Sequence, residues 1–231
     1  MTDAWEPPSH GALDDTPWPE TLVARVIDRG ADDDRVNGYA VLADLARNYD
    51  FTDLLYLALV GELPAVVASR RFRTAMAAAA PVSVGEASVH AGVLARLSGS
   101  TIASALGAGL VIAADHAGQV LADHAELLAW LDQPVGQAPA RFRTGADRTW
   151  IGNLVGALGE LRPGALGDDF TRDAARIALF HAAGVTVADR IQAALVVAAT
   201  VGVAAEALAT GPEHLASYPV KLPPFRYVED E

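Results

Sequence analysis

The stretch Ser98 to Leu128, SGSTIASALGAGLVIAADHAGQVLADHAELL, constrains the fold more than any other part of the sequence. Its alanines and glycines have no bulky side chains, so a helix built from them lets a neighbouring backbone approach closely. The pattern predicts a helix from Thr101 to Ala114, a break at Gly118 and a second helix that reaches Leu128. The imidazole of His116 lies at this predicted junction, where a buried polar group is costly unless it has a partner. His116 is therefore either a hydrogen-bonded core histidine or a working one.

The composition favours packed helices over a sheet. The chain has 231 residues, 52% of them hydrophobic and only 6% aromatic, and alanine is a strong helix former. The apolar stretch Val187 to Ala209 has almost no polar face, which predicts a helix that is buried on all sides. Two short β-favouring runs flank Arg29-Gly30-Ala31-Asp32 and predict a small hairpin. We therefore predict an all-α fold with a small N-terminal β-hairpin.

Charge and residue usage exclude several classes of function. The formal net charge of −12 argues against a nucleic-acid partner. The absence of cysteine excludes disulfides, thiolate metal sites and a cysteine nucleophile. The histidine spacing does not predict a metal site. The chain carries no signal-peptide pattern, and its apolar windows fall short of a bilayer crossing, so we expect a cytoplasmic protein with no membrane partner.

The sequence suggests three regions. Residues 1–20, rich in acidic residues and proline, are expected to form a flexible arm. Residues 21–131 and 169–231 are expected to form a large helical domain. Residues 132–168 contain the least regular internal stretch and are expected to be a reduced small domain or a loop region.

Charged side chains provide the candidate binding residues. Arg141, Arg143 and Arg148 cluster in the irregular region of an otherwise acidic chain. They can bind a polyanionic ligand through charge-assisted hydrogen bonds or simply be solvated, and Arg226 in the proline-rich tail allows the same two interpretations. Asp173 is expected in the first turns of its helix, where the helix dipole favours a carboxylate.

Three stretches carry a resemblance to a known family. VNGYAVLADLARNYDFTDLLYLALVGELP (Val36 to Pro64) resembles the N-terminal signature of the citrate synthase family. VHAGVLARLSGSTIASALGAGLVIAADHAGQ is similar to the family segment that leads into its catalytic histidine motif. AATVGVAAEALA (Ala198 to Ala209) resembles a later helix of the family. The chain is thus identified as a divergent, shortened member with a citrate synthase-like fold of many helices.

The resemblance implies a function. The family joins an acyl-CoA to an oxo-acid through an enolate, or runs the reverse cleavage as citryl-CoA lyases do. His116 matches the histidine that stabilises the enol oxygen, and Asp173 matches the aspartate that removes the proton. Arg148 and Arg226 would bind acid groups. The resemblance also implies a homodimer and a CoA thioester or small carboxylate as substrate, with no covalently bound cofactor.

The chain departs from the family pattern at several positions, among them Ala117 and Gln119 beside His116. The second catalytic histidine has no counterpart, because the matching stretch ends in Arg148. Ala199 and Glu206 replace an arginine and a histidine. Two further hypotheses follow. The chain is a catalytically silent paralogue that binds a metabolite or partners a full-length synthase, or its scaffold serves another substrate in specialised metabolism, with an apolar pocket lined by the helix over 187–209.

Overall fold

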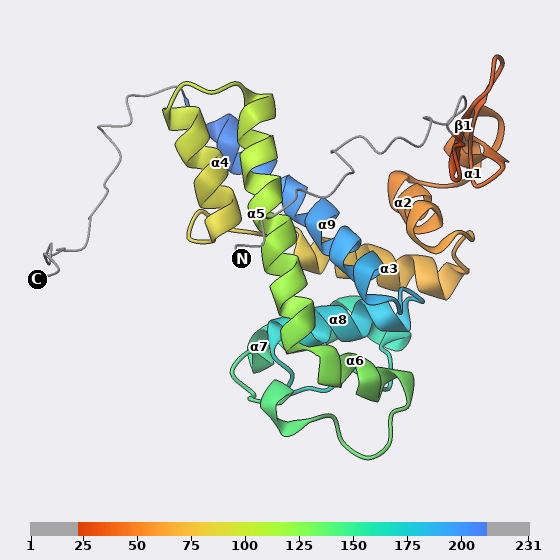
Figure 1. The fold of residues 1–231 in the computed structure, drawn as a ribbon. Helices are drawn as coiled ribbons and strands as arrows, with labels where there is room; N and C mark the ends of the chain where they lie inside the picture. Colours follow the sequence, from red (N-terminus) through yellow and green to blue (C-terminus); the bar gives the residue numbers. More distant parts are fainter. Residues whose placement is uncertain (1–22, 212–231) are drawn as a thin grey trace, which may run out of the picture. The chain divides into compact units, whose positions relative to one another are not determined.

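The structure, a computed structural model, describes residues 23–211. Arg226 and the predicted arm over residues 1–20 lie outside them. The chain divides into two compact units, Met1–Asn48 and Tyr49–Glu231, and each is considered by itself below. The predicted all-α class with one small sheet is confirmed (Figure 1).

The first unit contains the sheet. Its strands are β1 (Ile27–Arg29), β2 (Asp34–Val36) and β3 (Tyr39–Ala40), antiparallel in the order β1-β2-β3. The predicted hairpin is confirmed, and a third strand follows it. Asn37 and Gly38 connect β2 to β3 with φ angles of 48° and 85°, because a two-residue hairpin turn requires the left-handed region.

A π-helical turn η1 (Val41–Leu45) and the short helix α1 (Ala46–Asn48) complete this unit. The Asp33 carboxylate accepts hydrogen bonds from the backbone N–H groups of Leu42 and Ala43, each at 2.9 Å. These bonds favour the ionised carboxylate and lower the pKa of Asp33. They tie the start of η1 to the turn between β1 and β2.

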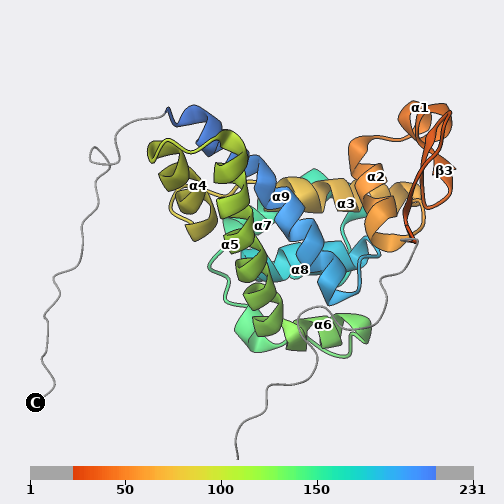
Figure 2. The same cartoon turned by 45° about the horizontal axis from the view of Figure 1, so that its top comes forward.

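The second unit consists of helices in the part of the chain that the structure describes. In chain order they are α2 (Phe51–Val60), α3 (Val66–Ala79), α4 (Ala87–Leu97), α5 (Ile102–Asp123), α6 (Ala125–Asp132), the 3-10 turn η2 (Ala140–Phe142), α7 (Arg148–Leu158), the 3-10 turn η3 (Gly159–Leu161), α8 (Arg172–Ala182) and α9 (Ala188–Ala209). Helices α4, α5 and α9 lie side by side, and α6, α7 and α8 gather near the C-terminal end of α5 (Figures 1 and 2).

Glycines allow α4, α5 and α9 to approach closely. A β-carbon on Gly109 of α5 would lie 2.5 Å from Cγ1 of Val203 on α9 and 2.8 Å from the Ser88 carbonyl oxygen on α4. A β-carbon on Gly202 would lie 2.7 Å from the Val82 carbonyl oxygen. Real β-carbon contacts are not this short, so these positions accept only glycine without a shift of the helices.

Helix α5 is continuous through Gly118, so the predicted break there is wrong. The side chain of Gln192 on α9 donates a hydrogen bond of 2.9 Å to the Ala114 carbonyl. A β-carbon on Gly118 would lie 3.1 Å from the same Gln192 nitrogen. Gly118 therefore makes room for a neighbouring side chain, and an interior glycine costs a helix only about 1 kcal/mol. The chain bends at His124 instead. The His124 ring stacks on the Phe142 ring, and the ring centroids lie 4.8 Å apart.

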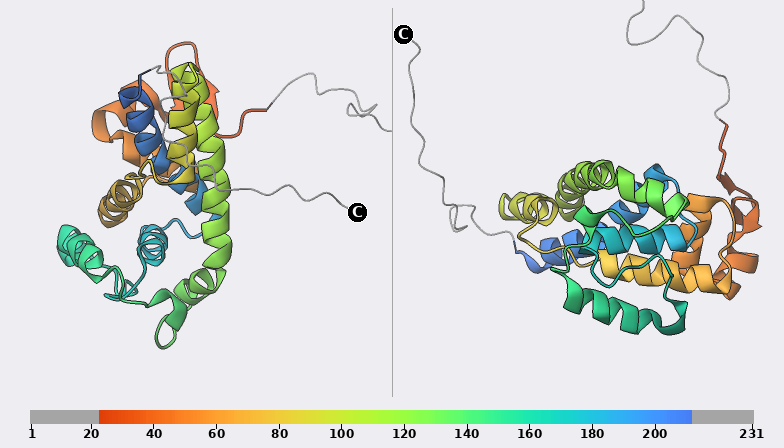
Figure 3. Two further views of the ribbon diagram at one scale, coloured as in Figure 1. Left: turned by 90° about the vertical axis from the view of Figure 1, so that its left-hand side faces the viewer. Right: turned by 90° about the horizontal axis from the view of Figure 1, so that it is seen from below.

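The large core lies where α3, α7, α8 and α9 meet (Figure 3). Phe72 and Phe180 are fully buried there, with ring centroids 5.8 Å apart. Thr171 caps α8, since its hydroxyl oxygen accepts a hydrogen bond from the Ala174 N–H. Asp168 and Asp169 precede this helix but do not cap it, because both carboxylates pair with arginines.

Helices α5 and α9 keep apolar residues at the surface. Val111 is 72% exposed, Val201 61% and Leu208 69%, so the prediction that the last helix is buried on all sides is wrong. By length and composition alone, each of the two helices could cross a membrane, so the expectation that the apolar windows fall short of a bilayer crossing is wrong. Both are also held by the close glycine contacts described above. The expectation of no membrane partner stays a prediction.

The glycine contacts generate a prediction with a matched control. Gly109→Ala is expected to lower the free energy of unfolding by about 1–3 kcal/mol, because its methyl group would collide with α4 and α9. A β-carbon on Gly107, two residues earlier on α5, would meet no atom within 4 Å. Gly107→Ala is expected to leave stability unchanged or raise it by up to about 1 kcal/mol. Urea unfolding measures both, and an equal effect of the two variants would contradict the close packing.

Candidate active site

A small cavity of about 70 Å³ lies in the helical unit. The end of α3 and the segment before α4 line it on one side, and α5, α8 and α9 enclose the rest. Its polar or charged lining residues are Glu86, Ser88, His116, Asp173 and Arg176. The other lining residues are apolar: Ala79, Pro81, Val82, Ala113, Ala117, Val120, Ile177, Leu195 and Ala199. The structure thus brings the two predicted catalytic residues to one cavity.

His116 reaches the cavity because α5 is continuous. Ala113, His116, Ala117 and Val120 recur at the spacing of one helix face, and all four line the cavity. Ala113 and Ala117 are buried, whereas His116 is exposed. His116 is therefore not the buried core histidine that was one of the two interpretations. Its imidazole lies where solvent and the cavity meet.

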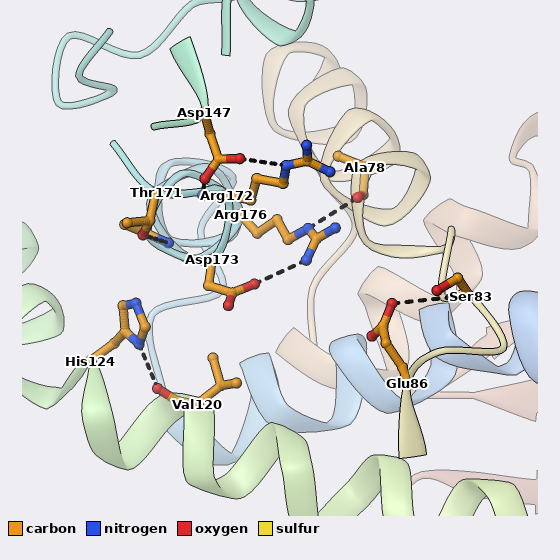
Figure 4. A network of polar contacts seen from close by, with 11 residues as sticks. Ala78, Ser83, Glu86, Val120, His124, Asp147, Thr171, Arg172, Asp173 and Arg176 are labelled. Atoms are coloured by element: carbon orange, nitrogen blue, oxygen red, sulfur yellow. Dashed lines mark hydrogen bonds and ion pairs between the residues drawn. The ribbon is translucent and has the colours of Figure 1, made fainter. Parts of the chain in front are cut away.

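Asp173 is held by a neighbour on its own helix. Its Oδ1 accepts a hydrogen bond of 2.9 Å from Nη1 of Arg176 (Figure 4). Arg176 in turn donates through Nε to the Ala78 carbonyl at 3.1 Å, and its guanidinium lies 5.6 Å from the centre of the Trp150 ring. The second oxygen, Oδ2, has no hydrogen-bond partner among the described residues. The carboxylate is thus oriented through one oxygen and free at the other.

Glu86 is a lining residue that the sequence analysis did not identify. It occupies the N-cap position of α4, and its Oε1 accepts a hydrogen bond of 3.1 Å from the Ser83 N–H. Figure 4 shows the Glu86 side chain at the start of α4 and the Asp173 side chain on α8. A glutamate before a helix is common, and nothing in the sequence places it near His116. Only the packing of α4 against α5 reveals it.

The predicted arginines lie elsewhere. Arg143 and Arg148 line a separate groove of about 490 Å³, together with Arg162. Arg143 forms an ion pair of 2.9 Å with Asp169, and its hydrogen bond lowers the pKa of that carboxyl group. Arg148 forms no ion pair with the described residues. This groove therefore contains one guanidinium without an ion pair within 4 Å among residues 23–211, although its charge also lowers the pKa of Asp169.

Arg141 lies in a third hollow. Its guanidinium forms a 3.0 Å ion pair with Glu126 and lies over the Phe142 ring. Arg141, Phe142 and Asp173 line an open hollow of about 530 Å³, so Asp173 borders both this hollow and the His116 cavity. Within residues 23–211, no group of three His, Asp or Glu side chains is placed to hold a metal ion.

The cavity groups suit proton transfer next to a carbonyl. A carboxylate with a free oxygen can accept a proton from carbon, and an imidazole can donate a hydrogen bond to the oxygen that becomes negative. Such a pair forms and stabilises an enolate. None of the described lining residues supplies a nucleophilic hydroxyl with an adjacent base, since the one hydroxyl among them is that of the buried Ser88.

Comparisons with known proteins identify the fold. No protein-family model matches the chain, and no curated protein matches its sequence. Among solved structures, the chain is similar to citryl-CoA lyase from Hydrogenobacter thermophilus. The two share 13% sequence identity with a TM-score of 0.62, over 91% of this chain and 97% of that chain. The chain therefore has an all-helical fold of the citrate synthase and citryl-CoA lyase type. That it is a shortened member stays a prediction.

The Arg143–Asp169 pair generates a prediction of pH dependence. The pKa of Asp169 is lowered in the folded protein. The ionised carboxylate therefore stabilises the fold at pH values above about 4, the usual pKa of an aspartate. This stabilisation is lost as the pH falls through the pKa that Asp169 has in the folded protein. Asp169→Asn is expected to cost at most about 1 kcal/mol at pH 7, because the pair is partly solvated. The difference from wild type is expected to shrink as the pH falls below about 4.

Urea unfolding of wild type and Asp169→Asn at pH 7 and at a pH below about 4 measures this difference in stability. Asp168→Asn is the control, because its carboxylate is 73% exposed, and the substitution is expected to change little at either pH. If the effect of Asp169→Asn on the free energy of unfolding does not change with pH, the ion pair of Arg143 with the ionised Asp169 does not contribute to stability.

Proposed function

We propose that the chain is an enzyme that makes or breaks a carbon–carbon bond next to a carbonyl group through an enolate. The observation that carries the proposal is that His116 and Asp173, on different helices, line the same cavity. The likeness to a citryl-CoA lyase structure supports a fold suited to this chemistry. A CoA thioester is the proposed substrate, and condensation with an oxo-acid or cleavage of a citryl-CoA type compound is the proposed reaction.

Asp173 is the proposed base. Its free oxygen, Oδ2, takes a proton from the carbon next to the thioester carbonyl, and the electron pair of that C–H bond moves toward the carbonyl oxygen. Arg176 holds the other oxygen and so fixes the direction in which the base points. Orientation of this kind lowers the entropy cost of reaching the transition state.

His116 is the proposed stabiliser of the enol oxygen. Its imidazole donates a hydrogen bond to the oxygen that gains the electron pair. The enolate carbon then attacks the carbonyl carbon of a second substrate, the π electrons of that carbonyl move to its oxygen, and the alkoxide takes a proton from solvent. In the cleavage direction, the substrate hydroxyl loses its proton to solvent, and its oxygen forms a carbonyl group as the carbon–carbon bond breaks to give the same enolate. The acid form of Asp173 then returns a proton to the enolate carbon.

Arginines outside the cavity are proposed to bind anionic parts of the substrate. Arg148 lines its groove without an ion-pair partner among the described residues, beside Arg143 and Arg162. Guanidinium groups bind carboxylate and phosphate oxygens well. Arg141 and Arg226 remain proposed contributors, the first beside Asp173 in the open hollow.

Proton exchange tests the enolate step alone. Wild-type protein in D₂O is expected to exchange the methyl protons of acetyl-CoA, followed by proton NMR. His116→Ala and Asp173→Asn are each expected to slow exchange by about 10²–10⁴-fold, the usual size of a general acid–base contribution. Condensation of acetyl-CoA with oxaloacetate and cleavage of citryl-CoA are measured in parallel.

Asp115→Asn is the matched control. Asp115 is exposed, adjoins His116 on α5 and does not line the cavity, so the rate is expected to stay within about twofold of wild type. No exchange by wild-type protein, together with binding of CoA or citrate, would instead favour the catalytically silent paralogue.

We also propose a homodimer formed through the exposed apolar residues of α5 and α9. Val111 and Leu208 are 72% and 69% exposed, and exposed apolar surface on neighbouring helices is typical of a partner interface. Light scattering is expected to give twice the chain mass of 24.1 kDa.

Val111→Arg is expected to shift the dimer toward monomer, because a charge would be buried in the interface. Val135→Arg is the control, since Val135 is 84% exposed in the connection between α6 and η2. A monomeric wild-type protein would contradict the proposal. A dimer that survives Val111→Arg would place the interface away from this face of α5.

A further inference from the structure

Helix α7 is connected to the proposed base by charged and aromatic side chains. Trp150 lies in the first turn of α7, and Arg172 and Arg176 lie one turn apart on α8. Residues at this spacing share one face of a helix, so both guanidinium groups reach the same ring. Each guanidinium carbon lies 5.6 Å from the centre of the Trp150 ring. At this distance the face of an indole attracts a cation.

Both guanidinium groups are neutralised by aspartates. Nε of Arg172 lies 2.7 Å from Oδ1 of Asp147, and Nη1 of Arg176 lies 2.9 Å from Oδ1 of Asp173 (Figure 4). Asp147 directly precedes α7 and also accepts a hydrogen bond of 3.2 Å from the Arg172 N–H. The ion pairs allow two like charges to share one ring, and they tie the start of α7 to the start of α8. These four residues and Trp150 form the Trp150 network.

Trp150 supplies a restraint on Arg176 that its hydrogen bonds do not. Nε of Arg176 donates to the Ala78 carbonyl and Nη1 donates to Asp173, while Nη2 forms no hydrogen bond with residues 23–211. Bonds in the plane of a guanidinium leave it free to tilt, whereas an aromatic ring against it restricts the tilt. The Asp173 carboxylate in turn has no hydrogen-bond partner other than Arg176 among the described residues. Its orientation therefore depends on Arg176, and that of Arg176 on Trp150.

We propose that Trp150 is a positioning residue for the base. It holds Arg176, and through Arg176 the Asp173 carboxylate, in the orientation that proton removal requires. The inference rests on the proposed function, because it names a residue that supports the same site. Trp150 does not line the His116 cavity, so it acts without touching the substrate. The position of α7, in the region over 132–168, thus controls the direction in which the base points.

Two substitutions of Trp150 test the role of the ring. Trp150→Leu is expected to lower kcat for proton exchange of acetyl-CoA by about threefold to thirtyfold, the range that a cation–π contact allows. KM is expected to stay within about twofold, because the residue lies outside the cavity lining. Trp150→Phe keeps an aromatic face, and its kcat is expected to stay within about threefold of wild type. An unchanged kcat of Trp150→Leu, or equal losses in both variants, would overturn the inference.

A double-mutant cycle tests whether Trp150 acts through Arg176. Arg176→Lys keeps the charge but loses the flat group that lies over the ring, and it is expected to slow exchange at least as much as Trp150→Leu. In the Arg176→Lys background, Trp150→Leu is expected to slow exchange by less than about twofold, because both changes remove one contact. Fully additive effects, or a wild-type rate for Arg176→Lys, would contradict the inference.

Val155→Ala is the matched control for stability. Val155 lies on the same helix, packs against the same core as Trp150 and is not part of the Trp150 network. Its truncation is expected to lower the unfolding temperature and to leave kcat within about twofold of wild type at temperatures where both proteins are folded. If Val155→Ala slows exchange as much as Trp150→Leu does, Trp150 only stabilises α7, and the inference fails.

NMR relaxation of the Arg176 Nε–H group separates this inference from the proposed function, because it needs folded protein but no catalysis. The group is expected to be rigid on the picosecond-to-nanosecond timescale in wild type, Trp150→Phe and Val155→Ala, and mobile in Trp150→Leu. A rigid Arg176 in folded Trp150→Leu would overturn the inference. Wild-type protein that exchanges no proton, with the expected change at Arg176, would contradict only the proposed function.

Discussion

The close approach of α4, α5 and α9 is the constraint on which the site depends. Gly109 of α5 leaves no room for a side chain beside Val203 of α9 and the Ser88 carbonyl of α4, and Gly202 of α9 leaves none beside Val82, which precedes α4. The hydrogen bond from Gln192 to the Ala114 carbonyl fixes α9 against α5 one turn before Gly118. These contacts set the distance between the helix that carries His116 and the helix that carries Leu195 and Ala199.

The continuity of α5 decides what His116 can do. In a helix broken at Gly118, the imidazole would occupy a junction and need a buried partner. In the continuous helix, His116 shares a face with Ala113, Ala117 and Val120, and two of these neighbours are alanines. The small side chains leave space in front of the imidazole, and α8 supplies a carboxylate on the other side of it. The site is thus an opening between helices, bordered by the polar side chains of Glu86, His116, Asp173 and Arg176.

The division of charge between the cavity and the surrounding grooves gives the site its chemical character. Arg176 donates a hydrogen bond to Asp173 in the cavity, while Arg143, Arg148 and Arg162 line a separate groove. The likeness to a citryl-CoA lyase structure at 13% identity accounts for the arrangement of the helices. This likeness does not fix which side chains line the cavity between the helices. In this chain most of the lining side chains are aliphatic.

The sequence by itself determined the helical class, the hairpin, and the candidacy of His116 and Asp173. These follow from local periodicity and from a motif, which are properties of neighbouring residues. The tertiary structure decided the rest. It replaced the break at Gly118 with one at His124, and it brought Glu86 to the cavity. Each of these depends on contacts between residues far apart in the chain, because a glycine or a carboxylate acquires its role only from what packs against it.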